Sequence, residues 1–220
     1  MKEHLPQLRL CSLFAPIRDD ELLAMLACLK PQLVHIQKGG SILRQGDAAR
    51  FFGVLLSGRA HIVRSDSHGA HNVVNIIEPG ALFAEAFACA SAETLPAGVY
   101  AVEPSCVLLF DQKRVMTGCR SGCMAHSMLV SGLLRSIADK NLQLTKKLEI
   151  VTQRTTREKV LAYLNNQQQS EEAGPFHIPF DRQGLADYLG VERTALSAEL
   201  SRLQKDGVIR YHKNEFELLK

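Results

Sequence analysis

The chain has no long apolar run, no dense set of cysteines and no strong excess of charge. No apolar run approaches the roughly 18 residues that a membrane helix needs, and Lys2, Glu3 and Arg9 stand where a signal peptide would carry its apolar stretch. These absences predict a soluble, cytoplasmic protein with no membrane partner. The six cysteines are scattered along the chain, so we expect thiols or ligands in a reducing compartment, not a disulfide scaffold.

Motifs typical of enzymes are also missing. The sequence has no glycine-rich phosphate loop, nucleophile elbow or zinc-protease spacing. His61, His68 and His71 fall on expected surface strands or turns, without a defined relation to a nucleophile or a carboxylate. We therefore expect that the protein is not an enzyme. Its length of 220 residues allows one or two domains.

Residues 181–207 have the pattern of a DNA-binding helix-turn-helix. Asp181 is a candidate N-cap of a short first helix that ends at Gly190, and Gly207 follows a second helix that ends at about Lys205. The inner faces of the two helices are apolar and consist of Leu185, Ala186, Leu189, Leu196, Leu200 and Leu203. A helical hairpin that packs only against protein is the alternative, but the small Ala186 and the turn at Gly190 favour the DNA-binding motif.

The candidate DNA contacts lie in this motif and just after it. Arg193, Thr194 and Ser197 occupy the outward N-terminal end of the second helix, which the motif places against base edges in the major groove. Residues 208–219 alternate around Lys213 and Asn214, which predicts a β-hairpin wing. Residues 151–220 carry ten basic and ten acidic side chains, so affinity must come from local cations, namely Arg182, Arg193, Arg202 and Lys213.

The segment from about Gly118 to Thr152 contains no proline and predicts one long helix. Apolar residues recur at alternating spacings of four and three, as in a coiled coil, at Val130, Leu134, Ile137, Asn141, Leu144, Leu148 and Val151. We expect this seam to form a homodimer interface, in which Asn141 can pair with its symmetry mate and fix the register. The alternative is a helix whose stripe packs on its own N-terminal domain.

The beginning of the same segment carries candidate metal or redox residues. Cys119, Cys123 and His126 would lie on one helical face at positions i, i+4 and i+7. They could bind zinc, iron or a cluster with a fourth ligand from elsewhere, or Cys123 could form a disulfide between two chains. The alternative is that both cysteines are small packing residues and that His126 is solvated.

The N-terminal half predicts a jelly roll or double-layered barrel preceded by helices. Residues 1–30 are expected to be helical, with Leu22, Leu23, Leu26 and Leu29 as a packing stripe. Short apolar runs separated by glycine-containing turns follow between residues 33 and 112, at 53–56, 60–63, 73–77 and 106–110. Such spacing is typical of an all-β barrel.

Four short phrases stand out in this half: residues 38–42 (KGGSI), 45–47 (QGD), 56–60 (LSGRA) and 79–85 (PGALFAE). Together with the order of barrel, long helix and winged helix-turn-helix, these phrases resemble the CRP/FNR superfamily of bacterial transcription regulators. The resemblance implies an α+β fold with a cyclic-nucleotide-binding-like sensor domain at 1–118, a dimerisation helix at 119–151 and a winged helix-turn-helix domain at 152–220. It further implies a homodimer that binds double-stranded DNA, with RNA polymerase as a possible second partner.

The resemblance breaks down at the cyclic AMP site. Glu85 matches the family's ribose-binding glutamate, but its phosphate-binding arginine falls in the stretch 95–97, which reads Leu-Pro-Ala. A buried phosphate without a cation would cost several kcal/mol, so we expect no cyclic AMP binding. Ala84 also replaces a glycine that is common before the glutamate. Phe83, Glu85 and Ala97 remain candidate residues of a pocket for another effector.

The effector stays open at this stage. The family's oxygen sensors carry closely spaced N-terminal cysteines, whereas only Cys11 and Cys28 occur here, so an N-terminal iron–sulfur cluster is not expected. The candidates are an apolar ligand in the barrel, a metal or redox signal at the Cys119, Cys123 and His126 face, and a haem with His126 or Cys123 as axial ligand.

The DNA-reading positions match the family only in part. Arg193 and Thr194 match the first two positions, but the third, usually an arginine, is Ala198, and the neighbouring Ser197 is a common contact position. Arg182 and Gln183 fall where the family binds phosphates, and we interpret Asp181 as a helix cap. The sequence thus predicts a homodimeric, sequence-specific transcription regulator that responds to an unidentified effector. The alternative is a ligand-binding or scaffold protein without a DNA role.

Overall fold

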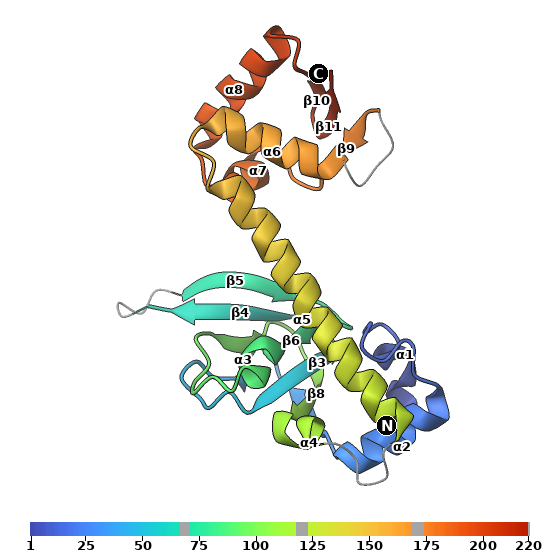
Figure 1. The fold of residues 1–220 in the computed structure, drawn as a ribbon. Coiled ribbons are helices and arrows are strands. Elements are labelled where there is room, and N and C mark those ends of the chain that lie inside the picture. Colours follow the sequence, from blue (N-terminus) through green and yellow to red (C-terminus); the bar gives the residue numbers. More distant parts are fainter. Residues whose placement is uncertain (67–70, 118–122, 169–173, 220) are drawn as a thin grey trace. The chain divides into compact units, whose positions relative to one another are not determined.

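The computed structural model describes residues 1–66, 71–117, 123–168 and 174–219. The chain divides into two compact units, Met1–Asp139 and Lys140–Lys220. The division falls within one continuous helix, α5 (Met124–Val151), so this helix contributes its first part to one unit and its second part to the other (Figure 1).

The first unit begins with short helices that pack on a β-structure. They are the 3-10 helix η1 (Lys2–His4), α1 (Leu5–Leu8) and α2 (Asp19–Leu29). Three acidic residues occupy the first turn of α2, where they complement the helix dipole. Three of the four residues of the predicted stripe on α2, Leu22, Leu26 and Leu29, are buried, whereas Leu23 is only half-buried and Met25 is buried in addition.

Eight strands of this unit form two antiparallel four-stranded sheets. The first sheet has the order β1-β8-β3-β6, with β1 at Gln32–Ile36, β8 at Ser105–Asp111, β3 at Phe51–Ser57 and β6 at Leu82–Phe83. The second has the order β2-β7-β4-β5, with β2 at Ser41–Leu43, β7 at Gly98–Ala101, β4 at Ala60–Ser65 and β5 at His71–Ile77. The predicted double-layered barrel is therefore present. Two short helices, α3 (Glu85–Cys89) and α4 (Gln112–Met116), were not predicted.

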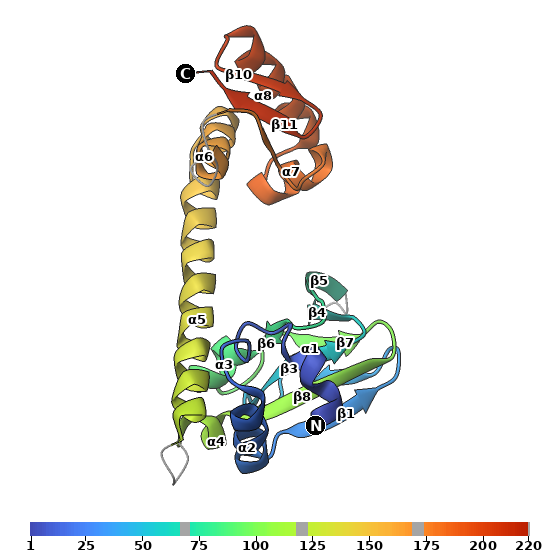
Figure 2. The same ribbon diagram turned by 90° about the vertical axis from the view of Figure 1, so that its right-hand side faces the viewer.

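The first sheet is buried on both faces, which explains its nearly continuous apolar strands. Alternate residues of β3 and β8, such as Val54 and Leu108, join a core with α1, α2 and the first turns of α5. The residues between them, such as Leu55 and Val107, face the second sheet and form the interior of the barrel. The first turns of α5 lie beside α2 in both views (Figures 1 and 2).

The second unit is a small helical domain with a three-stranded sheet. It contains the second part of α5 and the elements α6 (Thr156–Gln168), β9 (Phe176–His177), α7 (Arg182–Leu189), α8 (Arg193–Lys205), β10 (Ile209–His212) and β11 (Glu215–Leu218). The order β10-β11-β9 adds one strand to the predicted hairpin wing. Across the described parts of the chain, no helix is both long and apolar enough to cross a bilayer.

The long helix departs from prediction in two ways. It begins at Met124, not at about Gly118, and residues 118–122 lie outside the described residues. The residues that the first part of α5 buries are Ala125, His126, Leu129 and Leu133, which are not members of the predicted seam.

The predicted seam itself is divided between two environments. Val130 and Ile137 are partly buried against the core of the first unit, as the single-chain alternative predicts. Leu134, Leu144 and Leu148 are 69%, 61% and 59% exposed, and Asn141 is also exposed. Leu134 and most of the seam beyond Ile137 are therefore left exposed.

Candidate nucleic-acid interface and sensor sites

The helix-turn-helix has the caps and the tight turn that its sequence predicts. The Asp181 carboxylate accepts a hydrogen bond of 2.7 Å from the Gly184 amide, so Asp181 is the N-cap of α7. Gly190 ends α7 in the left-handed conformation, with φ at 62°. Leu185 and Ala186 of α7 are fully buried against Leu196 of α8. The cap, the left-handed glycine and the apolar contacts therefore fix the arrangement of α7 relative to α8.

The N-terminal end of α8 presents the predicted base-reading residues. Arg193 and Thr194 are exposed in its first turn, and Ser197 is half-buried one turn later. Arg202 does not join them, because it lies in the last turn of α8, roughly 180° around the helix from Arg193. Its guanidinium is 3.4 Å from the Glu199 carboxylate. The exposed group at the start of α8 is therefore Arg193 and Thr194 with Ser197 beside them.

The candidate phosphate-binding residues of α7 differ in what surrounds them. The Arg182 guanidinium lies over the ring of Tyr211 in β10, with 5.1 Å between Cζ and the ring centroid. Gln183 instead donates a hydrogen bond of 2.8 Å to Asp187 within α7. Lys213 is exposed in the turn of the wing. The structure thus brings Arg182 to the wing, a contact that the sequence did not predict.

A salt bridge fixes α8 on the helix before the motif. Arg157 of α6 contacts the carboxylates of Glu199 at 3.4 Å and Asp206 at 2.9 Å. The hydrogen bond to Asp206 raises the pKa of Arg157 above its ordinary value. Lys159 donates from α6 to the Leu189 carbonyl at the end of α7. Both helices of the motif are thereby tied to α6.

The three effector candidates in the barrel are largely core residues. Phe83 is 2% exposed, and its ring lies so close over Gly53 that a Cβ there would be 2.2 Å from it. Glu85 is also 2% exposed, and Ala97 is half-buried. Neither Ala97 nor its neighbour Leu95, which is buried, supplies a cation. The positions at 95–97 thus carry no cation that could face a phosphate.

The predicted metal face is not formed as expected. Cys119 lies outside the described residues, and Cys123 precedes α5 instead of lying on it. The prediction that His126 is solvated is wrong, because His126 is 6% exposed and its Nε2 lies 2.7 Å from the Val115 carbonyl oxygen. Nδ1 is buried without a hydrogen-bond partner among the described residues. The Nε2–H therefore donates to Val115, and the imidazole lies in the core.

Two family models match the chain, each to one of the two functional regions. The cyclic nucleotide-binding domain matches residues 33–121. The Crp-like helix-turn-helix domain matches residues 158–220. No curated protein sequence matches the chain.

Solved structures share the fold at low sequence identity. The catabolite activator protein of Thermus thermophilus is 23% identical, with a TM-score of 0.50, over 94% of this chain and 93% of that chain. The c-di-GMP responsive global regulator CLP of Xanthomonas campestris is 15% identical, with a TM-score of 0.54, over 92% and 100%. The sensor domain of the transcriptional regulator DNR from Pseudomonas aeruginosa is 24% identical, with a TM-score of 0.54, over 69% and 95%.

Proposed function

Because this chain belongs to the CRP/FNR superfamily of DNA-binding transcription regulators, we propose that it is a homodimer that binds a specific DNA sequence in response to an effector. The family is one of regulators, not enzymes. The observation that carries the proposal is the exposed pair Arg193 and Thr194 at the first turn of α8, on a helix-turn-helix with intact caps. Ser197 completes the base-reading group, while Arg182, Gln183 and Lys213 contact phosphates.

The test of this assignment removes one arginine and measures DNA binding by fluorescence anisotropy. DNA from upstream of the protein's own gene serves as the first probe. Arg193→Ala should weaken specific binding by about 1 to 3 kcal/mol, or roughly 5- to 150-fold, with little change for unrelated DNA. Lys205→Ala is the matched control, because it removes the same charge from the opposite end of α8. No loss of specific DNA affinity in Arg193→Ala would favour the alternative of a scaffold protein without a DNA role.

Dimerisation through α5 is supported by the part of the seam that the chain leaves uncovered. Leu134, Leu144 and Leu148 each expose more than half of their surface. An apolar stripe of this kind on a helix is stabilised by a second helix with the same stripe. In this arrangement the regions 1–118, 119–151 and 152–220 act as sensor, dimerisation helix and DNA-binding domain. RNA polymerase would be a further partner if the protein activates transcription.

The effector differs from cyclic AMP in this proposal. The ring of Phe83 fills the barrel above Gly53, and the positions at 95–97 carry no cation for a phosphate. Cyclic AMP at millimolar concentration should therefore leave the thermal unfolding midpoint unchanged, whereas a ligand that binds the folded state raises it. A rise with cyclic AMP would contradict this part of the proposal without affecting the DNA-binding assignment.

A further inference from the structure

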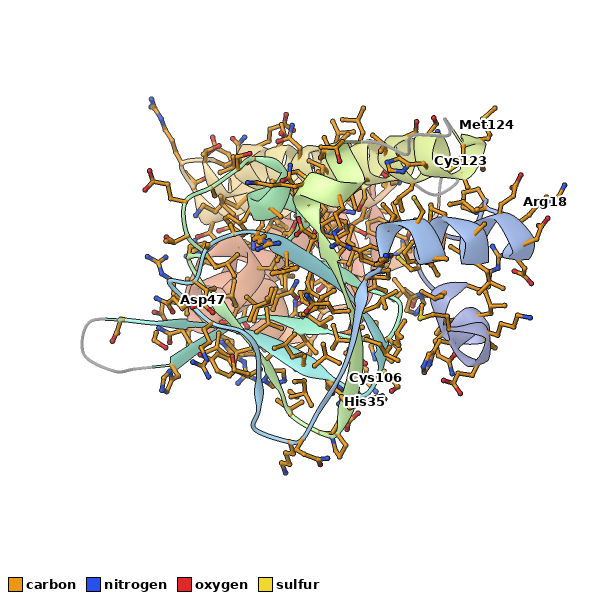
Figure 3. The ribbon with its side chains drawn as sticks, turned by 90° about the horizontal axis from the view of Figure 1, so that it is seen from below. Arg18, His35, Asp47, Cys106, Cys123 and Met124 are labelled. Atoms are coloured by element: carbon orange, nitrogen blue, oxygen red, sulfur yellow. The ribbon has the colours of Figure 1, made fainter. Side chains whose placement is uncertain are left out.

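A cavity between α2 and the beginning of α5 is lined by four sulfur-containing side chains. Its volume is about 250 Å³, and its lining residues are Glu21, Ala24, Met25, Cys28, Cys123, Met124 and Ala125. Cys123, which directly precedes α5, and Met124, its first residue, lie next to α2 (Figure 3). Cys123 and Cys28 of α2 therefore line the same cavity, whereas His126 is buried in the core.

The position of the four side chains makes the cavity accessible. Met25 is 1% exposed and belongs to the core, whereas Met124 is 70% exposed. Cys28 is exposed and Cys123 is half-buried. Both cysteines therefore keep some solvent exposure, whereas Met25 lies in the core and Met124 at the surface.

The donor set selects a soft metal ion of low coordination number. Thiolate and thioether sulfur atoms favour Cu(I) over harder ions, while structural zinc sites need four ligands. Within the described ranges, no group of three or more histidine, cysteine, aspartate or glutamate side chains is placed to hold a metal ion. Two thiolates with flanking thioethers satisfy Cu(I) but not zinc.

We propose that this cavity binds one Cu(I) ion between the thiolates of Cys28 and Cys123. Each thiol releases its proton to solvent and the ion stays monovalent, so the two thiolates and the ion together carry one negative charge. The Cys123 carbonyl accepts a hydrogen bond of 3.1 Å from the His126 amide at the start of α5. The bound ion would therefore tie α2 to the first turn of α5. Its effect on DNA binding rests on the proposed function, but the site does not.

Anaerobic titration of the full-length protein against the chromogenic Cu(I) chelator bathocuproine disulfonate tests the site. The protein should take one Cu(I) per chain from the chelator. Cys28→Ser and Cys123→Ser should each bind at least tenfold more weakly, because either change removes one of two thiolates. Cys89→Ser is the control, since this half-buried thiol lies on α3 outside the cavity, and its binding should equal that of the unaltered protein.

Two results would overturn the site. One is unchanged Cu(I) affinity in the variant with both cysteines replaced, with its circular dichroism spectrum unaltered. The other is formation of a disulfide between Cys28 and Cys123 on treatment with hydrogen peroxide, together with no uptake of Cu(I) by the reduced protein. Anisotropy on DNA with and without Cu(I) is measured separately. Loss of DNA binding in all samples would contradict the proposed function and leave the metal site standing.

Discussion

The Arg182 guanidinium lies over the Tyr211 ring, with 5.1 Å between Cζ and the ring centroid. This contact joins the first helix of the helix-turn-helix to the wing. The ring of Tyr211 is itself stacked on Phe216, at 5.5 Å between centroids, and Phe216 is buried in the core. The arginine is therefore oriented by a ring that the core holds in place, which would lower the entropy lost in the proposed contact with a phosphate.

Replacement of Tyr211 should weaken DNA binding through Arg182. Tyr211→Leu removes a cation–π contact of about 0.5 to 1 kcal/mol, so the dissociation constant should rise roughly 2- to 5-fold. Tyr211→Phe keeps the ring and should bind as the unaltered protein does. In the background of Arg182→Ala, the Tyr211→Leu change should have no further effect. Additive effects of the two changes in anisotropy measurements would show that Tyr211 acts independently of Arg182.

Leu144 and Leu142 provide a matched test of the dimer seam. Both leucines are exposed on α5, at 61% and 59%, but only Leu144 belongs to the seam. If two chains pair through the seam, Leu144→Lys loses about 1.5 kcal/mol or more in each chain and should weaken the dimer roughly 100-fold. Leu142→Lys should leave it unchanged. Sedimentation equilibrium measures both, and equal effects of the two changes would place the interface elsewhere.

Asp181 should contribute to stability as a helix cap. Asp181→Ala removes the acceptor for the Gly184 amide and should lower the free energy of unfolding by about 1 kcal/mol. Asp181→Asn keeps a side-chain oxygen at the same place and should lose only a small part of this stability. Urea unfolding, monitored by circular dichroism, gives both values. A loss of stability in the asparagine variant as large as in the alanine variant would mean that the charge matters more than the cap.

The helix-turn-helix could be predicted almost to the residue because its signals are local. An N-cap aspartate, a left-handed glycine and leucines at helical spacing act within a few residues of one another. The strand β9 was missed for the opposite reason. It consists only of Phe176 and His177, and it exists because Phe176 pairs with Phe216 of β11, far along the chain.

The sensor side could be predicted in outline but not in its side-chain environments. Alternation along the strands indicated the barrel, yet it could not indicate that Phe83 fills the interior over Gly53. The spacing of Cys123 and His126 suggested one helical face, whereas the helix begins between them and His126 is buried. Heptad spacing likewise cannot distinguish a partner helix from the chain's own domain, since Val130 and Ile137 contact their own core.

Ala84 should be a site where glycine stabilises the fold. Ala84 directly precedes α3 and has a left-handed backbone conformation, with φ at 61°. This conformation costs a residue that carries a Cβ atom roughly 1 to 2 kcal/mol. Glycine avoids this cost but loses more chain entropy on folding, so Ala84→Gly should raise the free energy of unfolding by about 0.5 kcal/mol. Ala86→Gly, within α3, should instead lower it by about 0.5 to 1 kcal/mol. Denaturant unfolding of both variants checks the opposite signs.

Ionisation of Tyr163 should lower the free energy of unfolding at high pH. Its side chain is 1% exposed, and its hydroxyl has no hydrogen-bond partner among the described residues. Burial raises the pKa of Tyr163 to about 12 from its ordinary value of 10.0. The unfolded chain therefore ionises first, so stability is complete below pH 10 and is lost as the pH rises toward 12.

Tyr163→Phe should remove this pH dependence and leave the core intact. At neutral pH the change deletes a buried, unpaired hydroxyl, so the free energy of unfolding should stay equal or rise by about 1 kcal/mol. Between pH 10 and 12 the advantage of the phenylalanine variant over the unaltered protein should grow. Tyr188→Phe is a control with a smaller expected change, because Tyr188 is less buried. A marked loss of stability in Tyr163→Phe at neutral pH would reveal that the hydroxyl is hydrogen-bonded, for instance to an internal water molecule.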